Sequence, residues 1–120
     1  MKKRIVGGVS ASLVLILVVT GCVFLGNLNP IASFTATPSH GASPLSVDLD
    51  PEESFDPNGT IAEYYWDFGD GQTASKTLLE TVTHIYINVQ SDSKVFTVIL
   101  TVTDDLGAED TAVKNITVDP

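Results

Sequence analysis

Asp67 and Asp70 are the carboxylates whose spacing could support acid–base chemistry. They stand in the run YYWDFGDG, residues 64–71, and many enzymes use a close pair of carboxylates as proton donor and acceptor. In an alternating strand, however, Asp67 falls on the outward face, and Asp70 begins a turn with Gly71. We expect Asp67 to bond backbone or hydroxyl groups across the hairpin and Asp70 to supply turn geometry, with no cleft at either residue.

Other catalytic groups are scarce in the sequence. His40 and His84 do not have a spacing that would hold a metal ion. No serine lies in a nucleophile elbow, and the chain has a single cysteine. The sequence therefore predicts a protein that is not an enzyme and that needs no cofactor to fold.

That cysteine, Cys22, closes an N-terminal targeting segment. Residues 2–4 are basic, and residues 5–25 contain no charged side chain. Residues 19–22 read Val-Thr-Gly-Cys, which fits the lipobox of bacterial-type lipoproteins. This pattern predicts a signal peptide over residues 1–22 with lipid attachment at Cys22, and a lone cysteine leaves no partner for an intramolecular disulfide.

An uncleaved signal anchor is the alternative. The uncharged run from Ile5 to Leu25 is long enough to cross a bilayer as an apolar helix. The basic residues before it would hold that end in the cytoplasm. Residues 23–30 contain Asn, Gly and Pro and read as a short tether. Both alternatives place the rest of the chain outside the cell, anchored to the membrane.

The part of the chain beyond Cys22 is strongly acidic. It has three lysines against fifteen acidic residues, a formal charge of −12. Such a surface repels nucleic acid and anionic lipid and favours cations. Residues 31–118 suffice for one small domain, which we expect to be monomeric.

Alternating apolar and polar residues predict an all-β fold with no helix beyond the N-terminal segment. The pattern fits an immunoglobulin-like β-sandwich of about seven strands, with Trp66 and Phe68 in its core. Tyr86 is expected to bond the backbone through its hydroxyl. In the last strand Val113 and Ile116 fall on opposite faces, which predicts a bulge or a register change. The expected strands cover residues 31–37, 45–50, 61–68, 72–75, 78–84, 94–104 and 111–118.

Taken in order, several short pieces of this sequence resemble the PKD (polycystic kidney disease) domain family. The resemblance covers residues 32–118 and departs from the family pattern at residues 87–94, where the link is longer and more polar. It implies an immunoglobulin-like module of cell-surface and secreted proteins that serves in binding or spacing. The matching pieces are ASF (32–34), SPLSV (43–47), SFDPNGTI (54–61), WDFGDG (66–71), HIY (84–86) and VILTVTD (98–104).

The resemblance also implies a calcium site to be weighed, because some collagenase PKD domains bind calcium. Asp56 and Asn58 lie in the loop after the second expected strand, and Asp104 and Asp105 follow the sixth. In the sandwich topology these two loops share one end, where carboxylate and amide oxygens suit calcium. Asn29 or a nearby carbonyl could join them. The alternative is that all of these residues only form turns.

The leading functional hypothesis is a membrane-tethered extracytoplasmic module that contacts protein or polysaccharide at the cell surface. The alternative is a non-catalytic accessory subunit of a secreted hydrolase. Asn58 and Asn115 each begin an Asn-x-Thr sequon, so both are candidates for glycosylation.

Overall fold

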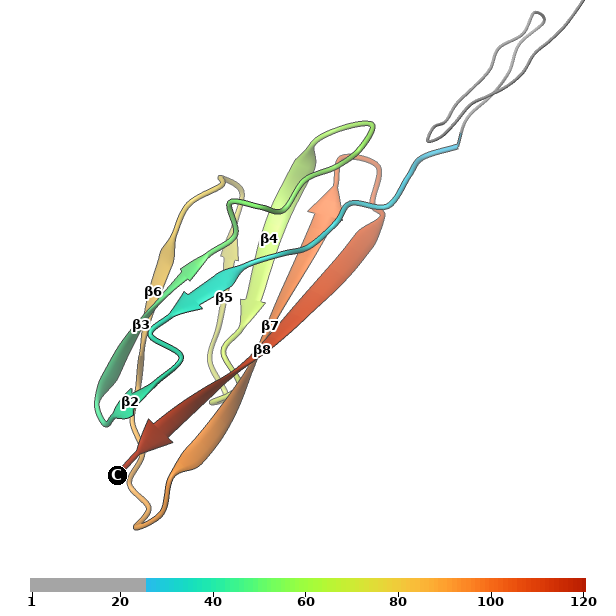
Figure 1. Ribbon diagram of the computed structural model, residues 1–120. Coiled ribbons are helices and arrows are strands. Elements are labelled where there is room, and N and C mark those ends of the chain that lie inside the picture. Colours follow the sequence, from blue (N-terminus) through green and yellow to red (C-terminus); the bar gives the residue numbers. More distant parts are fainter. Residues whose placement is uncertain (1–25) are drawn as a thin grey trace, which may run out of the picture.

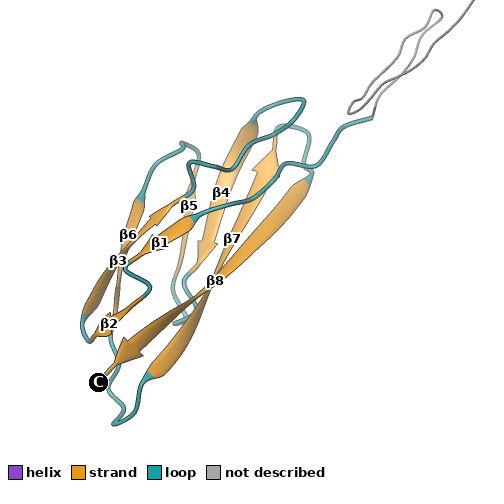
Figure 2. Ribbon diagram, viewed as in Figure 1, coloured by secondary structure: helices purple, strands orange, loops and turns teal. Residues whose placement is uncertain are grey.

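Strands alone make up the regular structure of residues 26–120, which are the residues that the computed structural model describes (Figures 1 and 2). They form two facing sheets, as predicted for a sandwich. The strands are β1 (Thr35–Thr37), β2 (His40–Ala42), β3 (Leu45–Asp50), β4 (Ile61–Asp67), β5 (Thr73–Lys76), β6 (Val82–Tyr86), β7 (Lys94–Asp104) and β8 (Glu109–Asp119).

The two sheets differ in size and share no strand. One has three strands in the order β1-β3-β6, and the other has five in the order β2-β8-β7-β4-β5. Strands β7 and β8 form the long central pair of the larger sheet and run side by side along the molecule (Figure 1). Every neighbouring pair is antiparallel except β2 with β8. The predicted all-β, immunoglobulin-like sandwich is confirmed.

Strict alternation explains why β7 forms and which face it buries. Successive side chains of a strand point to opposite faces of the sheet. Phe96, Val98, Leu100 and Val102 are accordingly buried, whereas the threonines between them lie on the outer face. Ile99 shares that outer face and is half-buried.

Trp66 lies at the centre of the core and is fully buried. Its neighbour across the β4–β7 ladder is Leu100. The ring of Phe34 meets the Trp66 ring edge-on, with centroids 5.1 Å apart, a favourable arrangement for two aromatic rings. The core thus joins both sheets without a disulfide. It comprises Phe34, Leu45, Val47, Leu49, Tyr64, Trp66, Phe68, Tyr86, Phe96, Val98, Leu100, Val102, Ile116 and Val118.

The sequence prediction missed one strand and misplaced another. The first strand stops before Pro38, which has no N–H to continue a ladder. The chain then crosses to the larger sheet, where β2 runs parallel to residues 117–119 of β8. Strand β6 begins at Val82 instead of residue 78, and Leu78 and Leu79 are exposed in the preceding loop.

The bulge predicted in the last strand is wrong. The β7–β8 ladder runs without interruption from Lys94 to Thr103. Val113 lies on the outer face opposite Ile99, whereas Ile116 points inward, so simple alternation places them on opposite faces. The register shift occurs in β4, between Ile61 and Glu63.

The predicted signal or anchor helix and the lipid attachment at Cys22 lie outside the described residues. Within residues 26–120, no helix has the length and apolar character needed to cross a bilayer.

Candidate functional site

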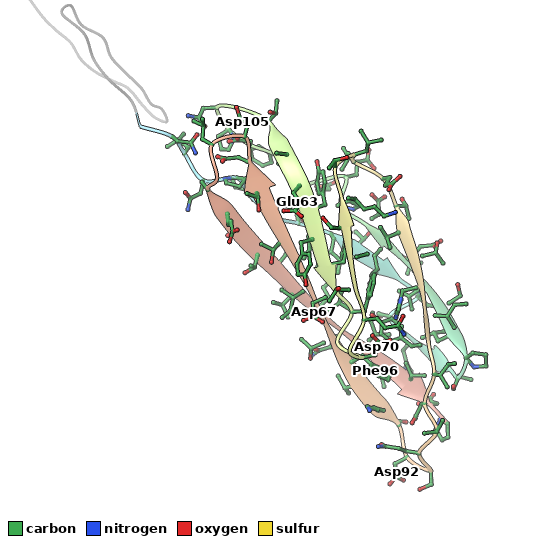
Figure 3. The ribbon with its side chains drawn as sticks, turned by 180° about the vertical axis from the view of Figure 1, so that it is seen from behind. Glu63, Asp67, Asp70, Asp92, Phe96 and Asp105 are labelled. Carbon is green, nitrogen blue, oxygen red and sulfur yellow. The ribbon has the colours of Figure 1, made fainter. Side chains whose placement is uncertain are left out.

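Three carboxylates meet at the end of the sandwich where the described chain begins, here termed the tether end; Figure 3 labels Asp105 there. Asp56 comes from the β3–β4 loop, Asp104 ends β7, and Asp105 follows it. An oxygen of each lies within 4.8 Å of the others. The fold therefore brings together three of the four residues predicted as calcium ligands.

Backbone hydrogen bonds fix the turn that carries two of these carboxylates. Asp104 is buried, and its Oδ1 accepts the N–H groups of Leu106 at 2.9 Å and Ala108 at 2.8 Å. The N–H of Asp105 donates to the carbonyl of Thr60 at 3.0 Å, which joins this turn to the loop before β4. The cluster therefore has a rigid frame on two sides.

The predicted tether, residues 23–30, is already bound to the domain from Asn27 onward. The side-chain amide of Asn27 donates to Asp104 Oδ2 at 2.6 Å, and the N–H of Leu28 donates to Asn58 Oδ1 at 3.3 Å. The Asn27 bond, aided by backbone N–H donors, lowers the pKa of Asp104, although burial alone would raise it. The carboxylate is thus held in its ionised form.

Two amide residues occupy places that differ from the prediction. The Asn58 side-chain oxygen accepts the Leu28 N–H and is thus engaged with the tether. Asn29 is exposed, and Asn27, which the sequence analysis missed, contacts Asp104 instead. Alternate residues of an extended segment share a face, so the sequence could not show which asparagine lies level with the carboxylate.

Asp56 supplies the observation that points to a cation. Its Oδ1 accepts the Asn58 N–H at 3.4 Å, but its Oδ2 is buried without any hydrogen-bond partner. A Cβ built on Gly59 would lie 2.7 Å from that oxygen and 2.9 Å from Asp105 Oδ1. Because a buried, unpaired carboxylate oxygen is costly, the glycine leaves room for a group that would pair with it.

The donor set fits calcium. The ion pairs among residues 26–120 lie elsewhere and join His40 to Asp119, Lys76 to Glu80 and His84 to Asp70. Three uncompensated carboxylates offer the hard oxygen ligands that calcium takes. The amide oxygen and nitrogen of Asn27 can be exchanged by a flip, which would add a neutral oxygen.

At the other end of β4, here termed the hairpin end, the carboxylates are satisfied internally. Asp67 Oδ1 accepts the Gly69 N–H at 3.0 Å, and Asp70 Oδ1 accepts the Gln72 N–H at 3.0 Å. Asp70 Oδ2 lies 2.7 Å from Nε2 of His84 on β6. Asp70 takes the predicted turn role. Asp67 does bond a backbone group, but the bond is local and does not cross the hairpin as predicted. The sequence gave no signal for the histidine partner of Asp70.

His84 lies within an aromatic cluster at the hairpin end. Its ring stacks on Phe68 with centroids 3.9 Å apart, and Tyr86 meets it edge-on. The Tyr86 hydroxyl donates to the Phe68 carbonyl at 2.9 Å, so its backbone bond connects the two sheets. Burial, helped by the charges of Asp70 and Asp67, raises the pKa of Tyr86. The hydroxyl therefore stays protonated and remains a donor.

The two sequons are on the surface. Asn58 and Asn115 are both exposed, and Asn115 Oδ1 accepts the hydroxyl of Thr97 at 2.9 Å.

The sequence analysis missed a pocket of about 310 Å³ beside the β3–β6 pair. It is lined by Asp50, Glu52, Leu79, Glu80 and Thr81.

Comparison with known proteins links this chain to segments of larger enzymes. The family model described as PKD domain matches residues 27–118. A microbial collagenase of Vibrio alginolyticus is 36% identical over 94 residues, which are 78% of this chain and 11% of the collagenase. The chain therefore spans about a tenth of the length of the curated relatives that it matches.

Solved structures show the same fold. The PKD1 domain of the metalloprotease PrtV from Vibrio cholerae is 35% identical, with a TM-score of 0.61, and the match covers 78% of this chain and all of that domain. A structure from a study of promiscuous carbohydrate-binding modules of the β-sandwich superfamily is 36% identical, with a TM-score of 0.71. That match covers 79% of this chain and 36% of the other.

Proposed function

The chain belongs to the PKD domain family, and from this premise we propose that it is a membrane-tethered, extracytoplasmic binding or spacer module without catalytic activity. One observation carries the proposal. Residues 26–120 form a complete sandwich whose hairpin-end carboxylates are occupied by internal bonds, and the chain enters it at one end from the apolar segment, residues 5–25. Such a design would hold a folded surface at the membrane and leave its exposed faces for contacts.

The outer face of the five-stranded sheet is the surface that we assign to ligand contacts. Tyr65 is 40% exposed there and lies between Thr101 of β7 and Ser75 of β5. An aromatic ring flanked by hydroxyl groups suits a sugar or a polar peptide. The ring can pack against an apolar part of the ligand, and its hydroxyl can form a hydrogen bond with a polar part. The likeness to a structure from work on carbohydrate-binding modules supports the polysaccharide reading.

Calcium at the tether end is part of the proposal. Asp56, Asp104 and Asp105 would hold the ion, with the Asn27 amide oxygen beside them. The bound cation would neutralise their mutual repulsion and stiffen the two loops. It would have a structural role and would not activate a substrate.

A sedimentation assay with insoluble polysaccharides and a pull-down from membrane extract test the proposed contacts. We expect Tyr65→Ala to reduce the retained fraction, because it removes the exposed ring. Ile85→Ala is the matched control, because Ile85 is exposed on the other sheet. Equal retention of both variants and the unmodified chain would reject this face as the contact surface.

An accessory role beside a secreted hydrolase is the second candidate. It is favoured by one observation, that the matched curated relatives are proteases of which the aligned segment is a small part. In that case the membrane extract would yield a hydrolase that copurifies with the chain. Recovery of cell-surface polymer without a hydrolase would favour the first function.

A further inference from the structure

The connection between the apolar N-terminal segment and the sandwich is unusually short. The apolar run ends at Leu25, and Asn27 is already bound to Asp104. Two residues span at most about 7 Å, and the five residues from Cys22 to Asn27 span about 18 Å. Whether the chain is held by a lipid at Cys22 or by an anchor to Leu25, the tether end must therefore lie at the membrane surface.

Large apolar side chains are exposed at this same end. Leu28 follows the Asn27 contact, and Leu106 occupies the β7–β8 turn between Asp105 and Gly107. Ile31 and Phe55 lie side by side and are joined by backbone hydrogen bonds of 2.7 and 3.0 Å. These residues are here termed the apolar rim. Their exposed fractions are 54% for Leu28, 44% for Ile31, 51% for Phe55 and 72% for Leu106.

Exposure alone does not distinguish this end, because Ile87, Val89 and Val95 are exposed towards the other. The attachment makes the difference. A connection this short keeps the rim at an effective concentration on the order of millimolar relative to the bilayer, so even weak affinity suffices for contact. The opposite end is held away by the length of the sandwich (Figure 1).

We propose that the apolar rim docks the tether end onto the surface of the bilayer to which residues 1–25 anchor the chain. This inference rests on the membrane tethering within the proposed function. Leu28 and Leu106 enter the interfacial layer of the lipid, where apolar side chains are stabilised. The occupant is a zwitterionic lipid surface, because the adjacent carboxylates of Asp56 and Asp105 repel anionic headgroups. Docking would orient the sandwich upright, with its sheets accessible from the side.

Depth-dependent quenching of tryptophan tests the docking with the full chain. The native Trp66 is fully buried and gives a constant background. Leu106→Trp and Leu28→Trp place a second indole in the rim, and Val89→Trp places one in the β6–β7 loop, towards the end that Asp92 marks in Figure 3. The chain is reconstituted into phosphatidylcholine vesicles with brominated acyl chains, and flotation measures its attachment.

Three outcomes are distinguishable. If the chain floats with the vesicles and both rim variants lose emission while Val89→Trp does not, docking is supported. If the chain floats but the brominated lipid lowers the emission of all three variants equally, tethering stands and docking is overturned. If the chain does not float, tethering and the docking that depends on it both fail. The two rim variants are independent, so misfolding of one does not decide the result.

Discussion

The two ends of β4 use the same residue type in opposite ways. At the hairpin end Asp67 and Asp70 bond backbone N–H groups, and Asp70 also bonds His84. At the tether end three carboxylates approach one another, and one oxygen of Asp56 has no partner. The first arrangement is satisfied by bonds within the protein, whereas the second leaves one buried carboxylate oxygen unpaired.

The difference shows that a cluster of acidic residues is informative through its unsatisfied atoms, not through its charge. Both regions contain aspartates that accept nearby backbone N–H groups, which are Asp67 and Asp70 at one end and Asp56 and Asp104 at the other. A histidine on β6 closes the hairpin end, whereas none of the ion pairs among residues 26–120 involves the three aspartates of the tether end. The following predictions set one end against the other.

Gly69→Ala is expected to have the largest effect, through the backbone of the hairpin end. Gly69 has a φ of 81°, and a Cβ there would collide with the carbonyl oxygen of Thr97. Positive φ costs roughly 1–2 kcal/mol and overpacking roughly 1–3 kcal/mol, together about 2–5 kcal/mol. Urea unfolding measures the loss. Gly71→Ala is the control, since Gly71 also has positive φ but open space around it, and equal losses would contradict the steric account.

Calcium should stabilise the protein through the tether end. A ligand that binds only the folded state adds about 2.7 kcal/mol at 100 times its Kd. The Tm should therefore rise by several degrees in millimolar calcium, and less in magnesium, which demands stricter geometry. Differential scanning calorimetry in calcium and in chelator measures the shift.

Two substitutions should abolish this calcium effect. Asp56→Asn removes a ligand charge, and Gly59→Ala fills the space between Asp56 and Asp105 without changing charge. Asp92→Asn, far from the cluster (Figure 3), is the control that also removes one negative charge. A Tm that is identical in calcium and in chelator would show that the three aspartates only form turns.

Neutralising one aspartate at each end should have opposite effects in chelator. Asp70→Asn weakens the bond to His84 and should cost about 1.5–3 kcal/mol, the range for a hydrogen bond to a charged group. Asp56→Asn relieves repulsion and should stabilise by roughly a few tenths of a kcal/mol. Urea titrations of the two variants compare the signs of the change in the free energy of unfolding. A loss of stability in both variants would mean that Asp56 is as well satisfied as Asp70.

The smallest effect is expected in acid. Because the pKa of Asp104 is lowered in the folded state, its contribution is present above the ordinary value of 3.8 and is lost as the pH falls through the lower, folded value. Asn27→Ala removes the main cause, so the drop in Tm between neutral pH and about pH 3 should become smaller. Asn29→Ala is the control. A similar drop in both variants would refute the assigned role of Asn27.

The sequence predicted those parts of the fold whose information is local. Alternation alone delimited β3 and β7, because one face of each strand is buried against the other sheet. The three residues of β2, His-Gly-Ala, carry no such pattern, and they pair with the end of β8, which is far away in the sequence. The start of β6 was also misplaced, since Leu78 and Leu79 are apolar and yet exposed.

The candidate site likewise has some contacts that the sequence predicted and others that it could not predict. Topology places Asp56 near Asp104 and Asp105, because the loops that carry them share one end of a sandwich. The bonds of Asp104 to Asn27 and of Asp70 to His84 depend on register between elements that are far apart in sequence. A one-residue difference in register turns a side chain to the other face, and a single sequence does not fix that register.

The parallel pairing of β2 with β8 has a mechanical consequence. The N–H of Thr117 donates to the carbonyl of Ser39 at 2.9 Å, and the N–H of Ser43 donates to the carbonyl of Asp119 at 3.0 Å. Tension between the tether and the last strand would draw these two strands past each other along their length. Such shear loads the bonds between them simultaneously instead of opening them one by one. The β2–β8 pair would therefore resist a pull along the length of the sandwich.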